Sequence, residues 1–252
     1  MGNKQTVLVT GSSRGLGAEI AKLFGEKGYQ VVVNYFNSEA KANEVVETIG
    51  SEQAIAVKAD VRDKEQVKAM VETVNERFGS IDIVVNNALI NFEFNPSAQE
   101  KVEELTWENY SEQFEGTIQA ALNTIQAVLP SMRKNQYGRV INIGTNLFQN
   151  PVVPYHQYTT AKAALIGFTR NMAKELGADQ ITVNMVSGGL LEKTDASAVT
   201  TPEVFDMIAA SSALNRVTTP ADVAEVVLFL GTEASRGVTG QNIVVDSGLT
   251  MN

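Results

Sequence analysis

The chain has 252 residues, of which 44% are hydrophobic, enough for a large core in one or two domains. Its net charge of -9 argues against nucleic acid or an anionic membrane as the main partner, because both repel acidic groups. The absence of cysteine excludes disulfides, a thiol nucleophile and a thiolate metal site. We find no signal peptide and no apolar run of about 20 residues, so we expect a soluble, cytoplasmic protein.

Apolar segments of strand length alternate along the chain with longer amphipathic segments. The expected strands are nearly continuous in Val and Ile, which is typical of strands buried on both faces of a parallel sheet; they are 6–10, 30–35, 54–60, 81–87, 138–144, 181–187 and 242–248. The expected helices are 15–28, 38–50, 63–79, 106–134, 158–177 and 220–231. This alternation predicts an α/β fold, a Rossmann-type doubly wound sheet of seven mostly parallel strands with helices on both faces.

No linker, repeat or low-complexity tract divides the sequence, so we predict a single domain over residues 1–252. The least regular segments are 88–105 and 188–219, and long loops of this kind often form lids or binding loops. Within the second of them, residues 203–214 are apolar enough to be a mobile lid over an acyl chain or a helix packed on the body, and both alternatives stay open.

A glycine-rich turn, TGSSRGLG, joins the first strand to the first helix. Glycines permit close backbone approach, and a helix N-terminus offers free N–H groups to phosphate oxygens. The spacing G-x-x-x-G-x-G differs from the G-x-G-x-x-G fingerprint, and a tight structural turn is the alternative. Its position at the first strand-helix junction favours a nucleotide site, for which the candidates are Gly11, Ser13, Arg14, Gly15, Leu16 and Gly17.

The residues after the second strand bear on the choice of cofactor. A site for NAD usually carries Asp or Glu there, to bind the ribose 2′-hydroxyl. This chain has NYFNS instead, with no carboxylate before Glu39, and Arg14 in the glycine turn could bind a 2′-phosphate. We therefore predict NADP(H), with Asn37 and Ser38 as weaker contacts, although Arg14 could also be a solvated turn residue.

Tyr158 and Lys162, in the stretch YHQYTTAK, lie four residues apart on one face of an expected helix. A free phenol has a pKa of about 10, and a neighbouring ammonium group lowers it by stabilising the phenolate. Such a pair can give a proton to a carbonyl oxygen, although the spacing alone is equally compatible with a surface pair.

Three motifs occur in a characteristic order: TGSSRGLG near the N-terminus, NNA after the fourth strand and YTTAK after the fifth. With these motifs nearly the whole chain resembles the short-chain dehydrogenase/reductase family. GRVINIG, AKAALIGFTR and ITVNMVS resemble most closely its 3-oxoacyl-(acyl-carrier-protein) reductases. The resemblance implies a cofactor half over about 1–140 and a catalytic and substrate half over about 141–252, with the substrate loop at 188–219.

The resemblance also implies roles for individual residues. Tyr158 would be the catalytic acid, and Lys162 would bind the nicotinamide ribose and lower the pKa of the tyrosine. The remaining implied cofactor contacts are Asp60 and Val61 beside the adenine, Asn87 and Ala88 along the cofactor, Thr194 at the carboxamide, and Gly189. In this family the long helices pair between subunits, which implies a homotetramer.

The chain departs from the family pattern at several positions. Thr145 stands where the family usually has serine thirteen residues before the tyrosine, and its hydroxyl can still donate to a carbonyl. Thr117 replaces an asparagine that supports a water relay to the lysine. Leu89 replaces the glycine of NNAG, and Gly188 replaces the proline of a Pro-Gly pair after the sixth strand.

Together these features predict an NADPH-dependent carbonyl reductase, with a 3-oxoacyl thioester as the first substrate and a small ketone, sugar or steroid-like alcohol as the alternative. Scattered basic residues such as Arg133 and Arg139 could contact an acidic carrier protein or be ordinary surface groups. The only histidine, His156, has no partner that would suggest a metal site. A rival hypothesis, based on the departures, is a cofactor-binding regulator with little catalysis.

Overall fold

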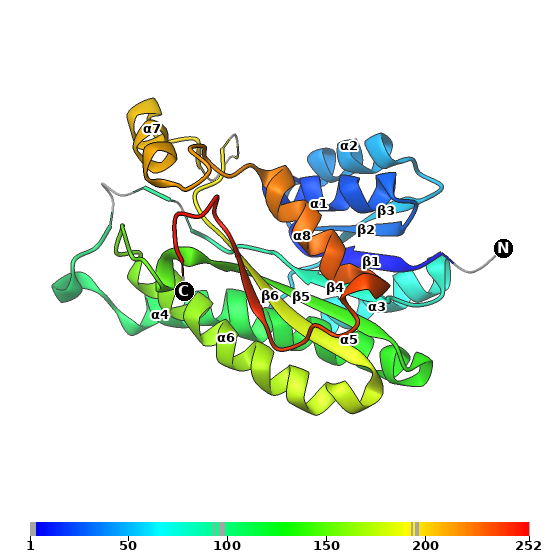
Figure 1. Ribbon diagram of the computed structural model, residues 1–252. Coiled ribbons are helices and arrows are strands. Elements are labelled where there is room, and N and C mark those ends of the chain that lie inside the picture. Colours follow the sequence, from blue (N-terminus) through cyan, green and yellow to red (C-terminus); the bar gives the residue numbers. More distant parts are fainter. Residues whose placement is uncertain (1–3, 93, 96–98, 193, 195–196, 252) are drawn as a thin grey trace.

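The computed structural model describes residues 4–92, 94–95, 99–192, 194 and 197–251. Seven strands form one sheet in the order β3-β2-β1-β4-β5-β6-β7, and all six neighbouring pairs are parallel (Figure 1). The strands are β1 (Thr6–Val9), β2 (Gln30–Tyr35), β3 (Ala54–Lys58), β4 (Ile83–Asn86), β5 (Gly138–Thr145), β6 (Ile181–Gly188) and β7 (Asn242–Val245). The predicted sheet is confirmed and, among the described residues, is parallel throughout.

Helices cover both faces of the sheet. They are α1 (Gly15–Glu26), α2 (Glu39–Ile49), α3 (Lys64–Phe78), α4 (Trp107–Phe114), α5 (Ala120–Asn135), α6 (His156–Leu176), α7 (Pro202–Ser211) and α8 (Pro220–Gly231). One core forms where α1, α2 and α8 pack on the sheet, with Phe24 and Val227 inside it, and a second forms beneath α3, α5 and α6, around Met70 and Leu176. Because both faces are buried, the strands need the continuous Val and Ile runs that the sequence shows.

The segment 106–134 is not the single helix that we predicted. It is divided into α4, a π-helical turn over Glu115–Gln119, and α5. The turn buries Gly116 and Thr117, and a Cβ atom on Gly116 would lie 2.8 Å from the Cγ1 atom of Ile90. The close approach of the segment after β4 therefore requires glycine here, and π-helical turns of this kind are frequent at functional sites.

The expected last strand, 242–248, was too long, because β7 ends at Val245. Asp246 then turns the chain: its carboxylate accepts hydrogen bonds from the backbone N–H groups of Gly248, Leu249 and Thr250 at 3.0–3.1 Å. It also accepts one from Asn146 Nδ2 at 3.0 Å, which ties the C-terminal segment to the end of β5.

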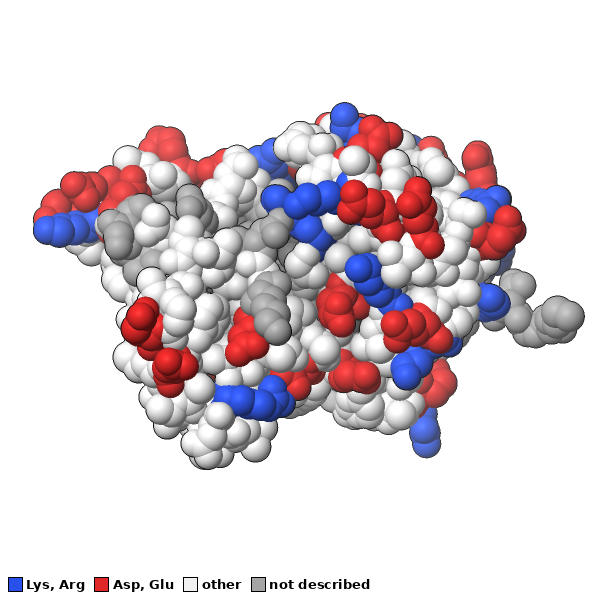
Figure 2. Space-filling model, turned by 90° about the horizontal axis from the view of Figure 1, so that it is seen from above, with Lys and Arg blue, Asp and Glu red and all other residues white. Residues whose placement is uncertain are grey.

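The segment 203–214 contains α7, and none of the residues of this helix is buried. It extends beyond the carboxyl edge of the sheet (Figure 1), with Phe205, Ile208 and Ala209 partly buried. On the face seen in Figure 2, acidic and basic side chains are interspersed and form no continuous basic patch. No helix in the described part of the chain is both long and apolar enough to cross a membrane.

Candidate active site

The parallel strands bring the predicted site residues to one edge of the sheet. The carboxyl ends of β1, β4, β5 and β6 lie side by side, which places the glycine turn, Asn87, Thr145 and Gly189 along a common line. In open α/β sheets this edge is where ligands bind.

The glycine turn is held against the end of β4. Asn87 Nδ2 donates to the backbone oxygens of Thr10 and Gly11 at 2.9 and 3.2 Å, and Thr10 Oγ1 accepts from the N–H groups of Asn87 and Ala88 at 2.9 and 3.0 Å. A Cβ atom on Gly17 would lie 2.5 Å from Asn87 Nδ2, and Gly11 has a φ of 61°. Gly11 and Gly17 are thus required by the conformation and close packing of the turn itself, whether or not a ligand binds.

Asn34, at the end of β2, is a component of this turn that the sequence did not reveal. Its side chain is buried, accepts a hydrogen bond from Gly11 N at 3.1 Å and donates to Ala59 O at 3.1 Å. The amide therefore links three strand ends, which explains why position 34 carries a neutral hydrogen-bonding residue.

The N-terminus of α1 fits the phosphate groups of a dinucleotide. No side chain caps this 12-residue helix and no acidic residue lies in its first turn. Arg14 occupies the N-cap position, at the end of the helix where anions bind. Gly15 has a φ of 56°, and nothing lies within 4 Å of the place where its Cβ would stand, so the turn is open to a ligand.

The other residues proposed for the 2′-phosphate belong to the glycine turn and to the segment after β2. Ser13, Arg14 and Gly15 border a groove that is also lined by Lys22, Lys41 and the acidic residues Glu19 and Glu44. Ser38 precedes α2 but makes no capping bond with its side chain, and Asn37 is exposed. Leu16 turns inward and packs against the core beneath α1.

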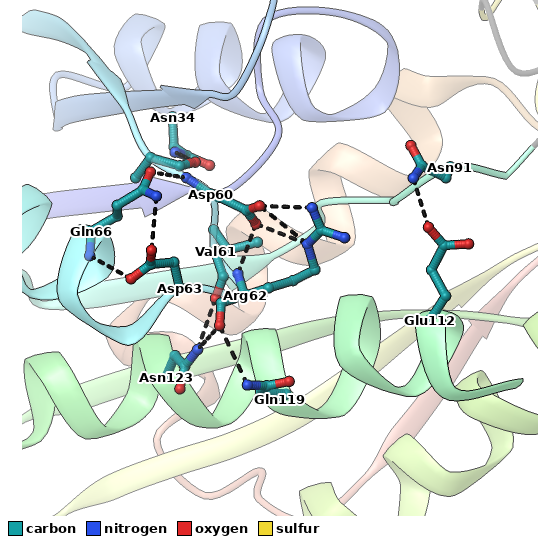
Figure 3. A network of polar contacts seen from close by, with 11 residues as sticks. Asn34, Asp60, Val61, Arg62, Asp63, Gln66, Asn91, Glu112, Gln119 and Asn123 are labelled. Carbon is teal, nitrogen blue, oxygen red and sulfur yellow. Dashed lines mark hydrogen bonds and ion pairs between the residues drawn. The ribbon is translucent and has the colours of Figure 1, made fainter. Parts of the chain in front are cut away.

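Asp60 and Val61 lie just beyond β3 in the polar network of Figure 3. The guanidinium of Arg62 donates hydrogen bonds to the Asp60 carboxylate, with Nε at 3.0 and 3.2 Å from its two oxygens and Nη2 at 2.7 Å from one of them. The hydrogen bond from Arg62 lowers the pKa of Asp60. Asn123 Nδ2 of α5 donates to the backbone oxygens of Val61 and Arg62 at 3.1 and 2.9 Å, which fixes this segment from below.

Thr145, Tyr158 and Lys162 come together where β5 meets the start of α6. A side-chain hydrogen bond joins Thr145 and Tyr158, and Lys162 Nζ lies 5.9 Å from the centre of the tyrosine ring. The side chain of Lys162 also donates to Ile143 O at 2.7 Å. Tyr158 is 6% exposed and Lys162 4%, so the two residues do not form the solvated surface pair that was the alternative.

The expectation that Lys162 lowers the pKa of Tyr158 is wrong for this structure. Burial raises the pKa of Tyr158 to about 12, opposed only by the hydrogen bond with Thr145, and burial lowers the pKa of Lys162 to about 8. The ammonium group points to Ile143 O, and the phenol lies under other rings, so desolvation is the larger effect. The phenol is therefore protonated at neutral pH, the state that a proton donor needs.

The positions that depart from the family pattern lie in different environments, some buried and some exposed. Thr117 borders the same small internal cavity as Lys162 and Asn86. Leu89 is 38% exposed, and its φ is not positive, so leucine occupies the position of the usual glycine without backbone strain. A Cβ on Gly188 would make ordinary contacts at 3.7 Å, whereas on Gly189 it would lie 3.0 Å from Asp246 Cβ. Thr194 forms reciprocal hydrogen bonds with Ser197, with the hydroxyls 2.9 Å apart.

Two phenylalanines that the sequence analysis did not single out contact the candidate acid. Phe92 stacks on the ring of Tyr158 with centroids 4.6 Å apart, and Phe94 meets it edge-on at 5.1 Å. Their sequence signal was the apolar alternation in INFEF within the irregular segment 88–105, but nothing local shows that this segment lies over α6.

Two of the basic residues considered for a carrier protein are engaged elsewhere. Arg139 is 3% exposed and forms an ion pair with Glu233 at 2.9 Å, so the prediction that it could contact a carrier protein at the surface is wrong. Arg133 forms an ion pair with Asp179 at 2.8 Å. Among the described residues, no group of three His, Cys, Asp or Glu side chains could hold a metal ion.

Comparisons with known proteins agree with this geometry. A family model described as enoyl-(acyl carrier protein) reductase matches residues 11–250. The 3-oxoacyl-(acyl-carrier-protein) reductase FabG of Staphylococcus aureus strain Mu50 is 33% identical over 249 residues, 98% of each chain. A crystal structure of 3-oxoacyl-(acyl-carrier protein) reductase from Brucella melitensis has a TM-score of 0.89 and 31% identity, covering 99% of this chain and 93% of that one.

A second similar structure is the promiscuous reductase LugOII, which catalyses keto-reduction at C1 during lugdunomycin biosynthesis. It has a TM-score of 0.87 and 33% identity over 97% of each chain. The match of the family model extends over most of the sequence, and these relatives act on C=O or CH–OH groups. The chain therefore belongs to the short-chain dehydrogenase/reductase family and is an oxidoreductase of that type.

Proposed function

We propose that the protein reduces a carbonyl group with NADPH and that its first substrate class is the 3-oxoacyl thioester. The observation that carries this proposal is the buried group of Thr145, Tyr158 and Lys162 at the sheet edge that also holds the glycine turn. Relatives named as 3-oxoacyl reductases support the substrate class.

A bound nicotinamide cofactor would supply the hydride that the carbonyl carbon takes up, with its two electrons. Tyr158 gives its phenolic proton to the carbonyl oxygen, so the C=O π bond is replaced by one C–H and one O–H bond. Thr145 hydrogen-bonds to the phenol before substrate binds, and its single hydroxyl proton can then turn to the same carbonyl oxygen as a second donor. Donors fixed in advance at the oxygen where charge develops are a large part of catalysis in such reactions.

Lys162 Nζ lies 5.9 Å from the centre of the phenol ring, and in its protonated form it would attract the negative charge that Tyr158 gains when it gives up its proton. Its Nζ is anchored by Ile143 O and its pKa of about 8 lets it exchange a proton near neutrality. Thr117 keeps a hydroxyl at the small cavity beside it, where it can take over part of the asparagine's role in a water relay.

The preference for NADP(H) over NAD(H) rests on charge. Arg14 lies at the open N-terminus of α1, and no carboxylate precedes Glu39 after β2. In this proposal, Asn37 and Ser38 give weaker contacts, Asp60 and Val61 flank the adenine, and Asn87, Ala88, Gly189 and Thr194 follow the cofactor. A homotetramer is part of the same family-based proposal.

The decisive experiment measures NADPH oxidation with acetoacetyl-coenzyme A. Saturable turnover that disappears in Tyr158→Phe supports the proposal, while full activity of that variant would overturn the assigned mechanism. A panel with crotonyl-coenzyme A, small ketones, sugars and hydroxysteroids tests other substrates. Tight NADPH binding without turnover of any of them would favour a cofactor-binding regulator.

Cofactor choice is tested by the ratio of kcat/KM for NADPH to kcat/KM for NADH. We expect a ratio well above one that falls in Arg14→Gln, because the proposal assigns the guanidinium to the 2′-phosphate, which NADH lacks. A preference for NADH in the wild-type protein would refute the assignment.

A further inference from the structure

Four aromatic rings form one cluster at the candidate active site. Phe92 stacks on Tyr158 with an interplanar angle of 19° and meets Tyr155 edge-on at 5.4 Å. Phe94 is edge-on to Tyr158 and to Tyr155, at 5.1 and 5.5 Å, and edge-on to Phe92 at 5.0 Å. These are the two arrangements that aromatic rings prefer.

The two phenylalanines are the outer members of this aromatic cluster. Tyr155 and Tyr158 are 5% and 6% exposed, whereas Phe92 and Phe94 are only partly buried. They are therefore the members of the cluster that are most accessible to a substrate approaching Tyr158.

The segment that carries Phe92 is anchored immediately before it. Asn91 takes a left-handed φ of 41° and its Nδ2 donates to Glu112 Oε1 at 2.7 Å (Figure 3). Gln113 Nε2 donates to the backbone oxygen of Ile90 at 3.0 Å. Helix α4 thus sets the direction in which the chain enters the cluster, and a surface ordered in advance binds with a smaller entropic penalty.

We propose that Phe92 and Phe94 form a substrate-binding wall that selects carbonyl compounds with an aromatic or other flat, conjugated ring beside the reacting carbonyl. The inference rests on the proposed carbonyl reduction and narrows its substrate class. A flat ring can stack on or meet these phenyl groups in the geometries that they already adopt with the tyrosines. A saturated acyl chain gains contact area there but no ring-to-ring preference, and leucine would serve it equally well.

The expected selectivity is modest and measurable. Aromatic pairs of this geometry are worth about 2- to 13-fold in an equilibrium beyond the area that they bury. Replacing either phenylalanine by leucine keeps most of the apolar bulk and removes the ring, so this factor is what each variant should lose for a substrate with an aromatic ring.

The test compares two β-keto esters that differ only in the ring: ethyl 3-oxo-3-phenylpropanoate and ethyl 3-cyclohexyl-3-oxopropanoate. The ratio of their kcat/KM values is measured with NADPH and full-length protein for wild type, Phe92→Leu, Phe94→Leu and Phe92→Tyr. Comparing ratios between variants cancels the different intrinsic reactivity of the two ketones. Phe229→Leu, at a 42% exposed position on α8, is the matched control.

We expect the phenyl-to-cyclohexyl ratio to fall by about 2- to 13-fold in each leucine variant, mainly through KM, and to stay within twofold of wild type in Phe92→Tyr and Phe229→Leu. Equal ratios in wild type and both leucine variants would overturn the inference. So would a gain of activity toward both esters in Phe92→Leu, because the ring would then be an obstacle to substrates of either kind.

Calorimetric binding of the two hydroxy-ester products to the protein with NADP⁺ gives the same ratio without turnover. If neither ester is reduced although NADPH binds, and acetoacetyl-coenzyme A and the other carbonyl compounds of the panel are not reduced either, the reductase proposal fails. The product-binding ratio then still decides ring selection: a phenyl preference that Phe92→Leu abolishes supports the wall, and an equal affinity for both products refutes it.

Discussion

The substitution Lys162→Met tests whether burying the charged lysine side chain, which removes it from water, lowers the stability of the folded protein. The side chain is 4% exposed, and burial lowers its pKa from 10.5 to about 8. Each unit of pKa is worth about 1.4 kcal/mol, so the depression corresponds to about 3 kcal/mol of folding free energy. Methionine has a similar length and removes the charge.

The sign of the effect follows from proton binding. Between pH 8 and 10.5 the unfolded lysine still holds its proton while the buried one has lost it, so the unfolded state binds more protons and stability rises with pH. Below pH 8 the full cost of burying the ammonium group is present, and above 10.5 it is absent. The unfolding free energy of the lysine protein minus that of Lys162→Met should therefore increase by about 3 kcal/mol across this window.

Loss of the hydrogen bond to Ile143 O adds a penalty to the variant, but this penalty does not depend on pH. The assay is urea unfolding at pH 7, 8, 9, 10 and 10.5, without cofactor. Both proteins should carry Tyr158→Phe, because the phenol also titrates differently in the two states. A stability difference that stays constant within about 1 kcal/mol over this range would refute the account of Lys162.

Three further predictions concern the turn, the acid and the adenine side. Gly17→Ala should destabilise the protein by about 1–3 kcal/mol, because the new Cβ atom would lie 2.5 Å from Asn87 Nδ2. The destabilisation is measured as a lower melting temperature. An unchanged melting temperature would mean that the turn can shift without cost. Tyr158→Phe should lower kcat/KM by about 10²–10⁴-fold while the circular dichroism spectrum is preserved. Arg62→Met should raise the KM for NADPH about tenfold with little change in kcat, because Asp60 loses the partner that orients it; a KM within twofold of wild type would contradict this.

Much of the frame of the site was predictable from the sequence. Runs such as QVVVNY and GRVINIG are apolar on both faces, which only a covered parallel sheet can accommodate, and their ends fixed the edge where Thr145 and the glycine turn lie. The spacing of Tyr158 and Lys162 placed them on one face of a helix because helical geometry is local.

The surroundings of these residues depended on contacts far apart in the chain. Asn34 contacts Gly11, and Phe92 lies on Tyr158, which is 66 positions away in the sequence. The direction of the pKa shift of Tyr158 was therefore not predictable from its neighbour at i+4, because burial outweighs a charge that is directed elsewhere. Periodicity is a property of the local backbone and can be read residue by residue, whereas desolvation exists only once distant segments have closed over a side chain.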